Sequence, residues 1–247
     1  MKLGEMNWPD VAELDREAIV AVFPIASFEQ HGHHLPFLTD TIETTGVVDR
    51  LDARMADRVL CLPTQWLGYS FHHMNFGGSM TATSETHIRM IVETVDGLVR
   101  AGFPRVLILN GHGGNQADLK VAQQILKEKH DATCILGASW WEVAAEALDQ
   151  VKETGPTGSG HAGEMETSLM LALRPDLVRT DRLQDDGWLP ASRHGGRVQR
   201  FRRIDEQTHR GVYGNPTAGS ADKGERMLTV VVDSLVEIVE DMLADRF

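Results

Sequence analysis

The stretch AIVAVFPIAS (residues 18–27) is a continuous run of mostly apolar side chains, and the polar sequence FEQHGHHLP (28–36) follows it directly. Shorter apolar runs of the same kind lie at residues 58–63, 105–110 and 133–139. Runs without polar alternation are typical of strands buried on both faces, as in a parallel sheet covered by helices. The four runs therefore predict a mostly parallel sheet, and the first of them ends at a cluster of histidines.

Segments with a helical spacing of apolar residues separate these strands and follow them. They cover residues 41–57, 84–101, 115–130, 164–173 and 220–244. Alternating strands and helices predict an α/β fold with helices on both faces of the sheet. The chain has 247 residues, which is enough for one good hydrophobic core and short for two typical domains. We therefore predict a single three-layer α/β/α domain over residues 1–247.

Composition limits the classes of partner and the compartment. Lys and Arg total 24 and Asp and Glu total 36, so the formal net charge is −12. Such a charge repels nucleic-acid phosphates and anionic bilayers, and no apolar run approaches the ~20 residues of a membrane span. The N-terminal residues lack the basic start and apolar stretch of a signal peptide, and Cys61 and Cys134 lie in apolar strand-like runs. We predict a cytoplasmic protein without nucleic-acid or membrane partners.

The first polar motif, SFEQHGHHLP (27–36), begins where the first strand ends and is followed by Thr-Asp-Thr (39–41). Glu29 and His31 are two residues apart, so both side chains point to the same side of an extended segment. With Asp40 returning after a proline-containing turn, they form a ligand set suited to a borderline divalent metal. The alternative is a polar strand end with surface histidines.

The second motif, NGHGGN (110–115), follows the strand at 105–110. His112 stands at the carboxyl end of that strand, and glycines such as Gly113 and Gly114 let the backbone approach a bound group closely. We therefore expect these two glycines to contact substrate. The alternatives are a loop whose histidine only caps or packs, and a phosphate-binding loop, although G-x-G-x-x-G and a Lys-Ser/Thr ending are missing.

The third motif, GSGHAGEMETS (158–168), leads into an apolar helix, and its glycines leave His161 accessible. Glu164 and Glu166 fall in the first helical turn, where the helix dipole favours acids. Residues two apart do not share a helix face, so at most one of them points into the site, and the spacing does not decide which one.

The segment 69–79 mixes aromatic and polar residues. It is expected to line a small-molecule pocket, with His73 and Ser79 contacting substrate; the alternative is ordinary loop packing.

The motifs EQHGHHLP, NGHGGN and HAGEMETS occur in the order found in the creatininase (creatinine amidohydrolase) family, which this chain resembles from about Trp8 to its last helix. The resemblance implies one α/β domain, often assembled as a hexamer, with two divalent metal ions. These are typically zinc, with manganese or iron in one position of some members. Carried over, Glu29, Asp40 and His112 would hold one ion, and His31 and Asp40 the other.

The chain departs from creatininase at two places. Gly113 and Gly114 stand where creatininase has a Tyr and a metal-binding Glu, so Glu166 is the predicted replacement ligand. The Trp, Asp and Glu that precede the third-motif histidine in creatininase are replaced by Thr157, Gly158 and Gly160. A guanidino ring has thereby lost its stacking and hydrogen-bonding partners, and creatinine is not the expected substrate.

We therefore expect a two-metal hydrolase of an unusual C–N amide bond in a small molecule, such as a cyclic amide or a formamide. The metals activate water, and His161, titrating near neutrality, protonates the leaving nitrogen, with Glu166 as the second catalytic residue. One alternative is a peptidase that releases a C-terminal dipeptide from a small modified peptide, as in another branch of the family. The other is a non-catalytic nucleotide- or metal-binding α/β protein.

The long segment 182–219 is rich in Gly, Arg, Asp and Pro and has little periodicity. A loop of this length is usually functional or part of an interface. Its arginines from Arg193 to Arg210 are placed to bind a phosphorylated substrate, in the same subunit or a neighbouring one. The alternative is a solvated basic loop on an acidic protein.

Overall fold

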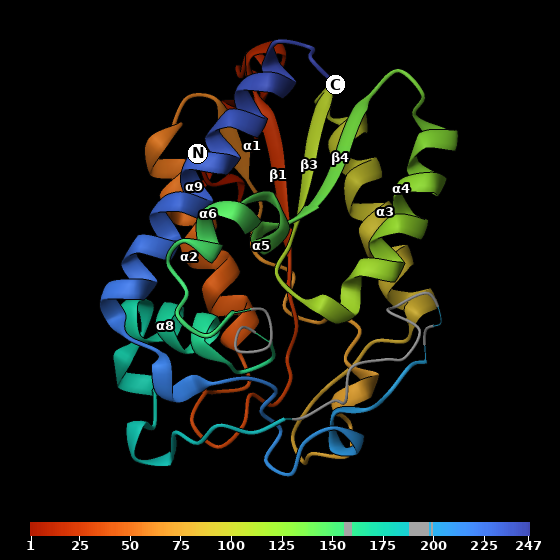
Figure 1. Ribbon diagram of the computed structural model, residues 1–247. Helices are drawn as coiled ribbons and strands as arrows, with labels where there is room; N and C mark the ends of the chain where they lie inside the picture. The colour runs from red at the N-terminus through yellow and green to blue at the C-terminus, as the bar shows by residue number, and fades with distance from the viewer. Residues whose placement is uncertain (156–159, 188–197, 199) are drawn as a thin grey trace.

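A central sheet of four parallel strands organises the computed structural model, which describes residues 1–155, 160–187, 198 and 200–247 (Figure 1). The strands lie in the order β2-β1-β3-β4. Their bounds are Val20–Ile25 for β1, Val59–Cys61 for β2, Arg105–Asn110 for β3 and Cys134–Ser139 for β4. All four predicted strands are present and every pairing is parallel, which confirms the predicted sheet.

The long helices also follow the prediction. The five that were expected are α2 (Thr39–Arg54), α3 (Ser84–Arg100), α4 (Gln116–Lys129), α8 (Glu164–Leu173) and α9 (Ala221–Leu243). Within the described ranges, three short helices were not expected, namely α1 (Trp8–Ala12), α5 (Trp140–Val143) and α6 (Ala145–Asp149). Helices of four or five residues are too short to show a periodic apolar pattern, so the sequence carries no clear signal for them.

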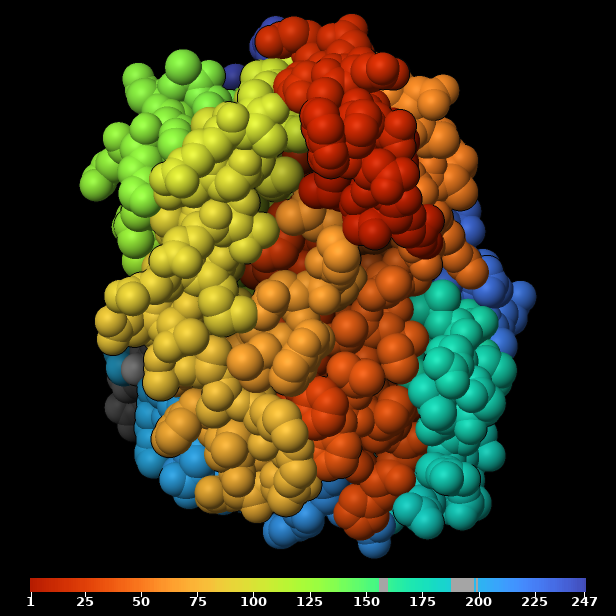
Figure 2. Space-filling view, turned by 180° about the vertical axis from the view of Figure 1, so that it is seen from behind, coloured from red at the N-terminus to blue at the C-terminus, as the bar shows by residue number. Residues whose placement is uncertain are grey.

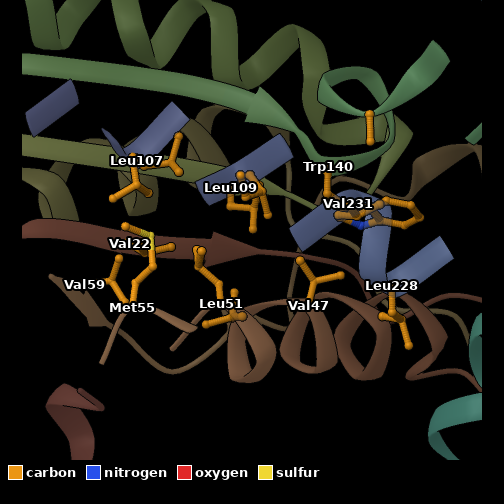
Figure 3. Close-up of a cluster of buried hydrophobic side chains, with 14 of the residues drawn as sticks. Val22, Val47, Leu51, Met55, Val59, Leu107, Leu109, Trp140, Leu228 and Val231 are labelled. Carbon is orange, nitrogen blue, oxygen red and sulfur yellow. The ribbon is translucent and has the colours of Figure 1, made fainter. Parts of the chain in front are cut away.

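One face of the sheet is covered by α2, α8 and α9, which lie together in Figure 1. Alternate strand residues such as Val22 and Leu107 point to this side and pack against Val47 and Leu51 of α2 and Val231 of α9 (Figure 3). Each of these five side chains is fully buried. Their continuous apolar cluster holds α2 firmly on β1, and this contact fixes where the first turn of α2 lies.

The other face is covered by α3, α4 and the N-terminal segment. Seen from behind, the N-terminal residues (red) and α3 (yellow) lie over this side of the molecule (Figure 2). Here Phe23 and Ile108 of the sheet pack against Ile91 and Val95 of α3 and Leu126 of α4. The two separate clusters on opposite faces confirm a three-layer α/β/α arrangement. Among the described residues, no helix combines the length and apolar character needed to cross a bilayer.

The strand register places three strand ends side by side. Ile25 of β1 pairs with Asn110 of β3, and Asn110 pairs with Ser139 of β4. Polar residues that directly follow these strands therefore converge on one edge of the sheet, where ligands bind in open α/β folds.

Candidate metal centre

Four side chains gather at this edge and are almost completely inaccessible to solvent. Glu29 and His31 come from the loop after β1, Asp40 from the first turn of α2, and His112 from the loop after β3. None of the four is more than 5% exposed. Charged groups this deeply buried are normally paired or coordinate a metal, so their mutual distances decide what the cluster can do.

The carboxylate of Asp40 lies between two imidazoles. Its Oδ1 is 2.8 Å from His31 Nε2, and its Oδ2 is 2.9 Å from His112 Nδ1. Ser27 Oγ donates a hydrogen bond to the same Oδ2 at 2.7 Å. The carboxylate of Asp40 is therefore in contact with both imidazoles.

His31 is oriented by the backbone. Its Nδ1 lies 3.0 Å from the carbonyl oxygen of Glu29, so Nδ1–H donates there, and Nε2 is the nitrogen that faces Asp40. Glu166 Oε2 lies 3.6 Å from the same Nε2. The ligand atoms of His31, Asp40 and Glu166 all fall within 4.8 Å of one another. A histidine that binds a metal commonly donates its other N–H to a backbone carbonyl in this way.

The surroundings of the Glu29 carboxylate show whether a divalent cation fits this cluster. Both of its carboxylate oxygens are buried and have no hydrogen-bond partner in the described structure. Oε1 lies 3.2 Å from His73 Nε2 and 3.5 Å from His161 Nδ1, and Oε2 lies 3.2 Å from His112 Nε2. Buried acceptors without donors are costly, and a divalent ion shared with these imidazoles removes that cost. The donor set of carboxylates and imidazoles suits zinc, manganese or iron.

The protonation of the cluster follows from its burial and its mixed charges. Burial raises the pKa of Glu29 and of Glu166 to about 7. Burial lowers the pKa of His31 and His112, but the neighbouring carboxylates outweigh it and raise these values to about 10 and about 9. Burial raises the pKa of Asp40, yet the two histidines hold it well below its ordinary value. The metal-free cluster thus retains protons that a bound cation would displace.

The two glutamates of α8 point to different places. Glu164 accepts hydrogen bonds from Lys223 Nζ at 2.7 Å and from the backbone N–H groups of Glu153 and Thr154. Glu166 instead lies at the cluster, where the backbone N–H of Ala162 donates to its Oε2. The geometry therefore separates the two acids that the sequence spacing left equivalent, and it brings Glu166 to His31.

His161 stands at the edge of the same cluster. Its Nε2 lies 2.7 Å from the carbonyl oxygen of Gln30, so Nε2–H donates there and Nδ1 faces Glu29. The next residue, Ala162, has φ = 53°, a left-handed conformation that turns the chain sharply toward α8. Burial, with a smaller contribution from His31, lowers the pKa of His161 well below 6.5, so the expected titration near neutrality is wrong for the metal-free protein. Desolvation disfavours the charged imidazole.

A cavity of about 250 Å³ opens onto these groups. Gly113, Gly114 and His73, which the sequence predicts to contact substrate, line this cavity, and Gln30 Nε2 donates to His73 Nδ1 at 2.9 Å. Ser79 is not among the lining residues, and its Oγ accepts a hydrogen bond from the backbone N–H of Gln30 at 3.0 Å. The substrate contact expected of Ser79 stays a prediction.

The sequence analysis missed aromatic side chains in the cavity wall. Trp140 and Trp141 line the cavity from α5, directly after β4. Both tryptophans directly follow a predicted strand, and this position is the sequence signal that could have identified them as cavity residues. Thr157, Gly158 and Gly160 stand where creatininase has aromatic and acidic residues. Thr157 and Gly158 lie outside the described residues, whereas Gly160 lines the cavity.

The segment 182–219 contributes to the cavity through Ile204. Arg200 lies 3.6 Å from Glu206 and Arg203 lies 3.0 Å from Asp205, so these two arginines pair with acids of their own segment. Arg193 and Arg197 lie outside the described residues.

The family model for creatininase, described as creatinine amidohydrolase, matches residues 4–239. A mycofactocin precursor peptide peptidase from Mycobacterium tuberculosis is 32% identical over 96% of this chain and 91% of its own length. A 3-dehydro-scyllo-inosose hydrolase from Thermotoga maritima is 26% identical over 98% of this chain and 83% of its own. A creatinine amidohydrolase from Pseudomonas putida is 27% identical over 97% and 96%.

Solved structures give the same result. A manganese creatininase superposes with a TM-score of 0.85 and 25% identity, covering 98% of each chain. A mutant creatininase of the Zn-Zn type superposes with a TM-score of 0.84 and 26% identity, again over 98% of each chain.

Proposed function

The chain belongs to the creatininase family of amidohydrolases, and we propose that it uses two divalent ions to hydrolyse an unusual C–N amide bond in a small molecule other than creatinine. The observation that carries this proposal is the position of Asp40 between His31 and His112, beside the unpartnered carboxylate of Glu29. Buried acids and imidazoles in this arrangement bind divalent metals, and related creatininases are of manganese and Zn-Zn types.

The five proposed ligands divide into two sets that share Asp40. Glu29 and His112 lie on one side of it, and His31 and Glu166 lie on the other. We favour zinc, with manganese or iron in one position, because the set mixes imidazole nitrogen with carboxylate oxygen. When bound, the ions polarise the amide carbonyl and lower the pKa of the attacking water from near 16 toward about 7.

His161 is suited to move the proton between water and the leaving nitrogen. Its Nε2–H is held by the carbonyl of Gln30, so Nδ1 presents a lone pair toward the cavity. The proton that Nδ1 takes from the attacking water passes to the amide nitrogen as the C–N bond breaks, and the carbonyl carbon keeps the water oxygen. Glu166 lies beside His31, and its carboxylate is one of the charged groups that would orient the attacking water.

The substrate is proposed to be small and different from creatinine. A Cβ placed on Gly113 meets nothing within 4 Å, so the space that a larger side chain would fill is open. The cavity of about 250 Å³ accepts a small cyclic amide or formamide beside Trp140 and Trp141.

A second candidate function is a peptidase that releases a C-terminal dipeptide from a small modified peptide. It is favoured by the 32% identity to a mycofactocin precursor peptide peptidase, compared with 27% to a creatinine amidohydrolase. It is also favoured by Phe71 and Phe201, which are 51% and 61% exposed and lie with ring centroids 6.4 Å apart. Because His72 of the cavity wall contacts Phe201, this aromatic pair is adjacent to the cavity and can hold a longer substrate.

We also propose that the protein acts in the cytoplasm as a homohexamer, which the family resemblance favours. Cys61 and Cys134 are both free, as in proteins of reducing compartments. Light scattering coupled to size-exclusion chromatography measures the subunit number directly.

The test of the function measures metal content per subunit and then hydrolysis by the same metal-replete sample. Substrates are creatinine, a cyclic imide, a formamidopyrimidine nucleotide and short peptides with free C-termini. About two ions per subunit with turnover of the imide or the formamide support the main proposal, and turnover of a peptide supports the second candidate. Creatinine as the best substrate contradicts the proposed substrate class. Failure to bind any metal after reconstitution contradicts the two-metal proposal and favours a nucleotide-binding protein.

A further inference from the structure

His72 lies in the wall of the cavity but has no role in the chemistry described above. Resting on the proposed two-metal function, we propose that His72 is a direct ligand of the ion held by Glu29 and His112. The ligand atoms of Glu29, His72 and His112 all lie within 4.8 Å of one another, so one ion can reach all three.

The imidazole of His72 is held in place and has a free nitrogen. Its Nδ1 is buried and has no hydrogen-bond partner in the described part of the chain. The ring stacks on His112, with centroids 5.6 Å apart and 17° between the planes, and Phe201 packs edge-on at 6.0 Å. A buried nitrogen without a partner is costly unless it binds something, and the equally unpartnered carboxylate of Glu29 lies within reach of a shared ion.

The neighbouring His73 does not compete for this role. Gln30 Nε2 donates to His73 Nδ1 at 2.9 Å, which leaves the proton of His73 on Nε2. Neither nitrogen of His73 therefore has a lone pair free for a metal. Of the two adjacent histidines in the 3₁₀ helix Phe71–His73, His72 is the one with a nitrogen free for a metal.

The position of His112 supports a ligand set that includes His72. Its Nε2 lies 3.2 Å from Glu29 Oε2 and 3.0 Å from the carbonyl oxygen of Tyr69, and its Nδ1 lies 2.9 Å from Asp40 Oδ2. His72 would thus add a second imidazole to the ion held by Glu29, Asp40 and His112. A set of imidazole nitrogens and carboxylate oxygens suits zinc, manganese or iron.

Gly114 makes room for this imidazole. A Cβ on Gly114 would lie 2.8 Å from His72 Cε1, 2.4 Å from His112 Nε2 and 2.2 Å from the carbonyl oxygen of Tyr69. A larger residue at position 114 would therefore clash with the Tyr69 backbone and with both imidazoles where they now lie, so the close packing of His72 beside His112 requires a glycine here.

The test compares the wild type with His72→Phe, which keeps a ring of similar size but has no ligand atom. Zinc affinity is measured by chelator competition, and the coordination of cobalt-substituted protein is followed by visible absorption. We expect His72→Phe to bind one of its two ions at least about 10-fold more weakly and to change the cobalt spectrum. The matched control is His33→Ala, which removes an exposed histidine of the first motif and should change neither readout.

A second variant keeps the test independent of folding defects. His72→Cys offers a thiolate to the same ion, and cobalt should then give a thiolate charge-transfer band that wild type and His72→Ser lack. The inference about His72 is wrong if the His72 variants bind both ions as tightly as the wild type and the cobalt-loaded His72→Cys protein shows no thiolate band. The proposed function still stands in that case, provided that the wild type binds two ions and hydrolyses its substrate. If the wild type binds no metal, both fail together.

Discussion

Lys223 Nζ lies 2.7 Å from Glu164 Oε1 in the interior of the protein, where Glu164 is completely buried. The ammonium also donates to the carbonyl oxygen of Ala218 at 2.7 Å. This ion pair ties the first turn of α9 to the first turn of α8, and it occupies Glu164 fully. Glu166, two residues further on, points instead toward His31, at 3.6 Å.

The two glutamates should therefore respond differently to the same substitution. Glu166→Gln is expected to lose one of two bound ions and to keep its stability, whereas Glu164→Gln keeps both ions. Because Glu164→Gln removes the buried one of the two carboxylates that pair with Lys223, the other being Glu153 at 3.0 Å, its free energy of unfolding should fall by about 1–3 kcal/mol. Metal analysis and urea unfolding check both variants. Loss of metal in Glu164→Gln with retention in Glu166→Gln would reverse the assignment.

Asp40→Ala is expected to abolish binding of both ions, because this carboxylate contacts the imidazoles on both sides of the cluster. Metal content should fall from about two per subunit to near zero. The control is Asp49→Ala on the same helix, where the aspartate pairs with Lys2 at the surface and 47% of its side chain is exposed. A protein that keeps two ions after loss of Asp40 would contradict a shared carboxylate.

Most of the fold could be predicted because its signals are local. The buried strand AIVAVFPIAS carries no polar alternation, and only a sheet covered on both faces accommodates such a strand. The helix α9 shows its apolar stripe over more than six turns, so its packing face is repeated many times in the sequence. By contrast, α5 and α6 are too short to repeat any pattern, and tertiary contacts decide them.

The site could be predicted only as far as residue types and strand ends reveal it. Spacing alone left Glu164 and Glu166 equivalent, because the choice depends on Lys223, which is 59 residues away along the chain. The hydroxyl of Ser79 is occupied by the backbone of Gln30, 49 residues away, and this pairing leaves no trace in the local sequence. The pKa of His161 is likewise lowered by burial, and burial depends on tertiary packing that the residue types around His161 do not reveal.

His161→Gln should lower kcat by about 10²–10⁴-fold while leaving metal content unchanged. The reason is that His161 Nδ1 faces the cavity, whereas its Nε2 is held by the carbonyl of Gln30. Glutamine retains a polar side chain but cannot carry a proton from water to the leaving nitrogen. Steady-state kinetics on the metal-loaded variant measure the effect, and an unchanged kcat would show that the proton takes another route.

Two glycines of one loop form a matched pair for testing how the metal ligands are positioned. A Cβ on Gly111 would lie 1.6 Å from Thr44 Oγ1 of α2, whereas a Cβ on Gly113 meets nothing within 4 Å. Gly111→Ala should push the loop from α2, separate His112 from Asp40, and cost about 1–3 kcal/mol of stability. Gly113→Ala should fold normally and raise KM by narrowing the cavity. Equal stability of the two variants, measured by urea unfolding, would contradict this account.

The metal-free protein should lose stability as the pH rises from 7 to 9. The folded-state pKa of His31 is raised to about 10 and that of His112 to about 9, from ordinary values near 6.5, because the attraction of Asp40 and Glu29 outweighs burial. A group with a raised pKa contributes its full stabilisation below the unfolded value, and that contribution disappears as the pH passes through the folded value. The lowered pKa values of His73 and His161 affect stability only below about pH 6.5, and that of Asp40 only below about pH 4, so none of them opposes the trend.

In the metal-loaded protein a cation takes the place of the protons on His31 and His112, so its melting temperature should change little between pH 7 and 9. Thermal unfolding of both forms in matched buffers makes the comparison, and a metal-free melting temperature that rises between pH 7 and 9 would show that the two histidines do not hold their protons in the cluster.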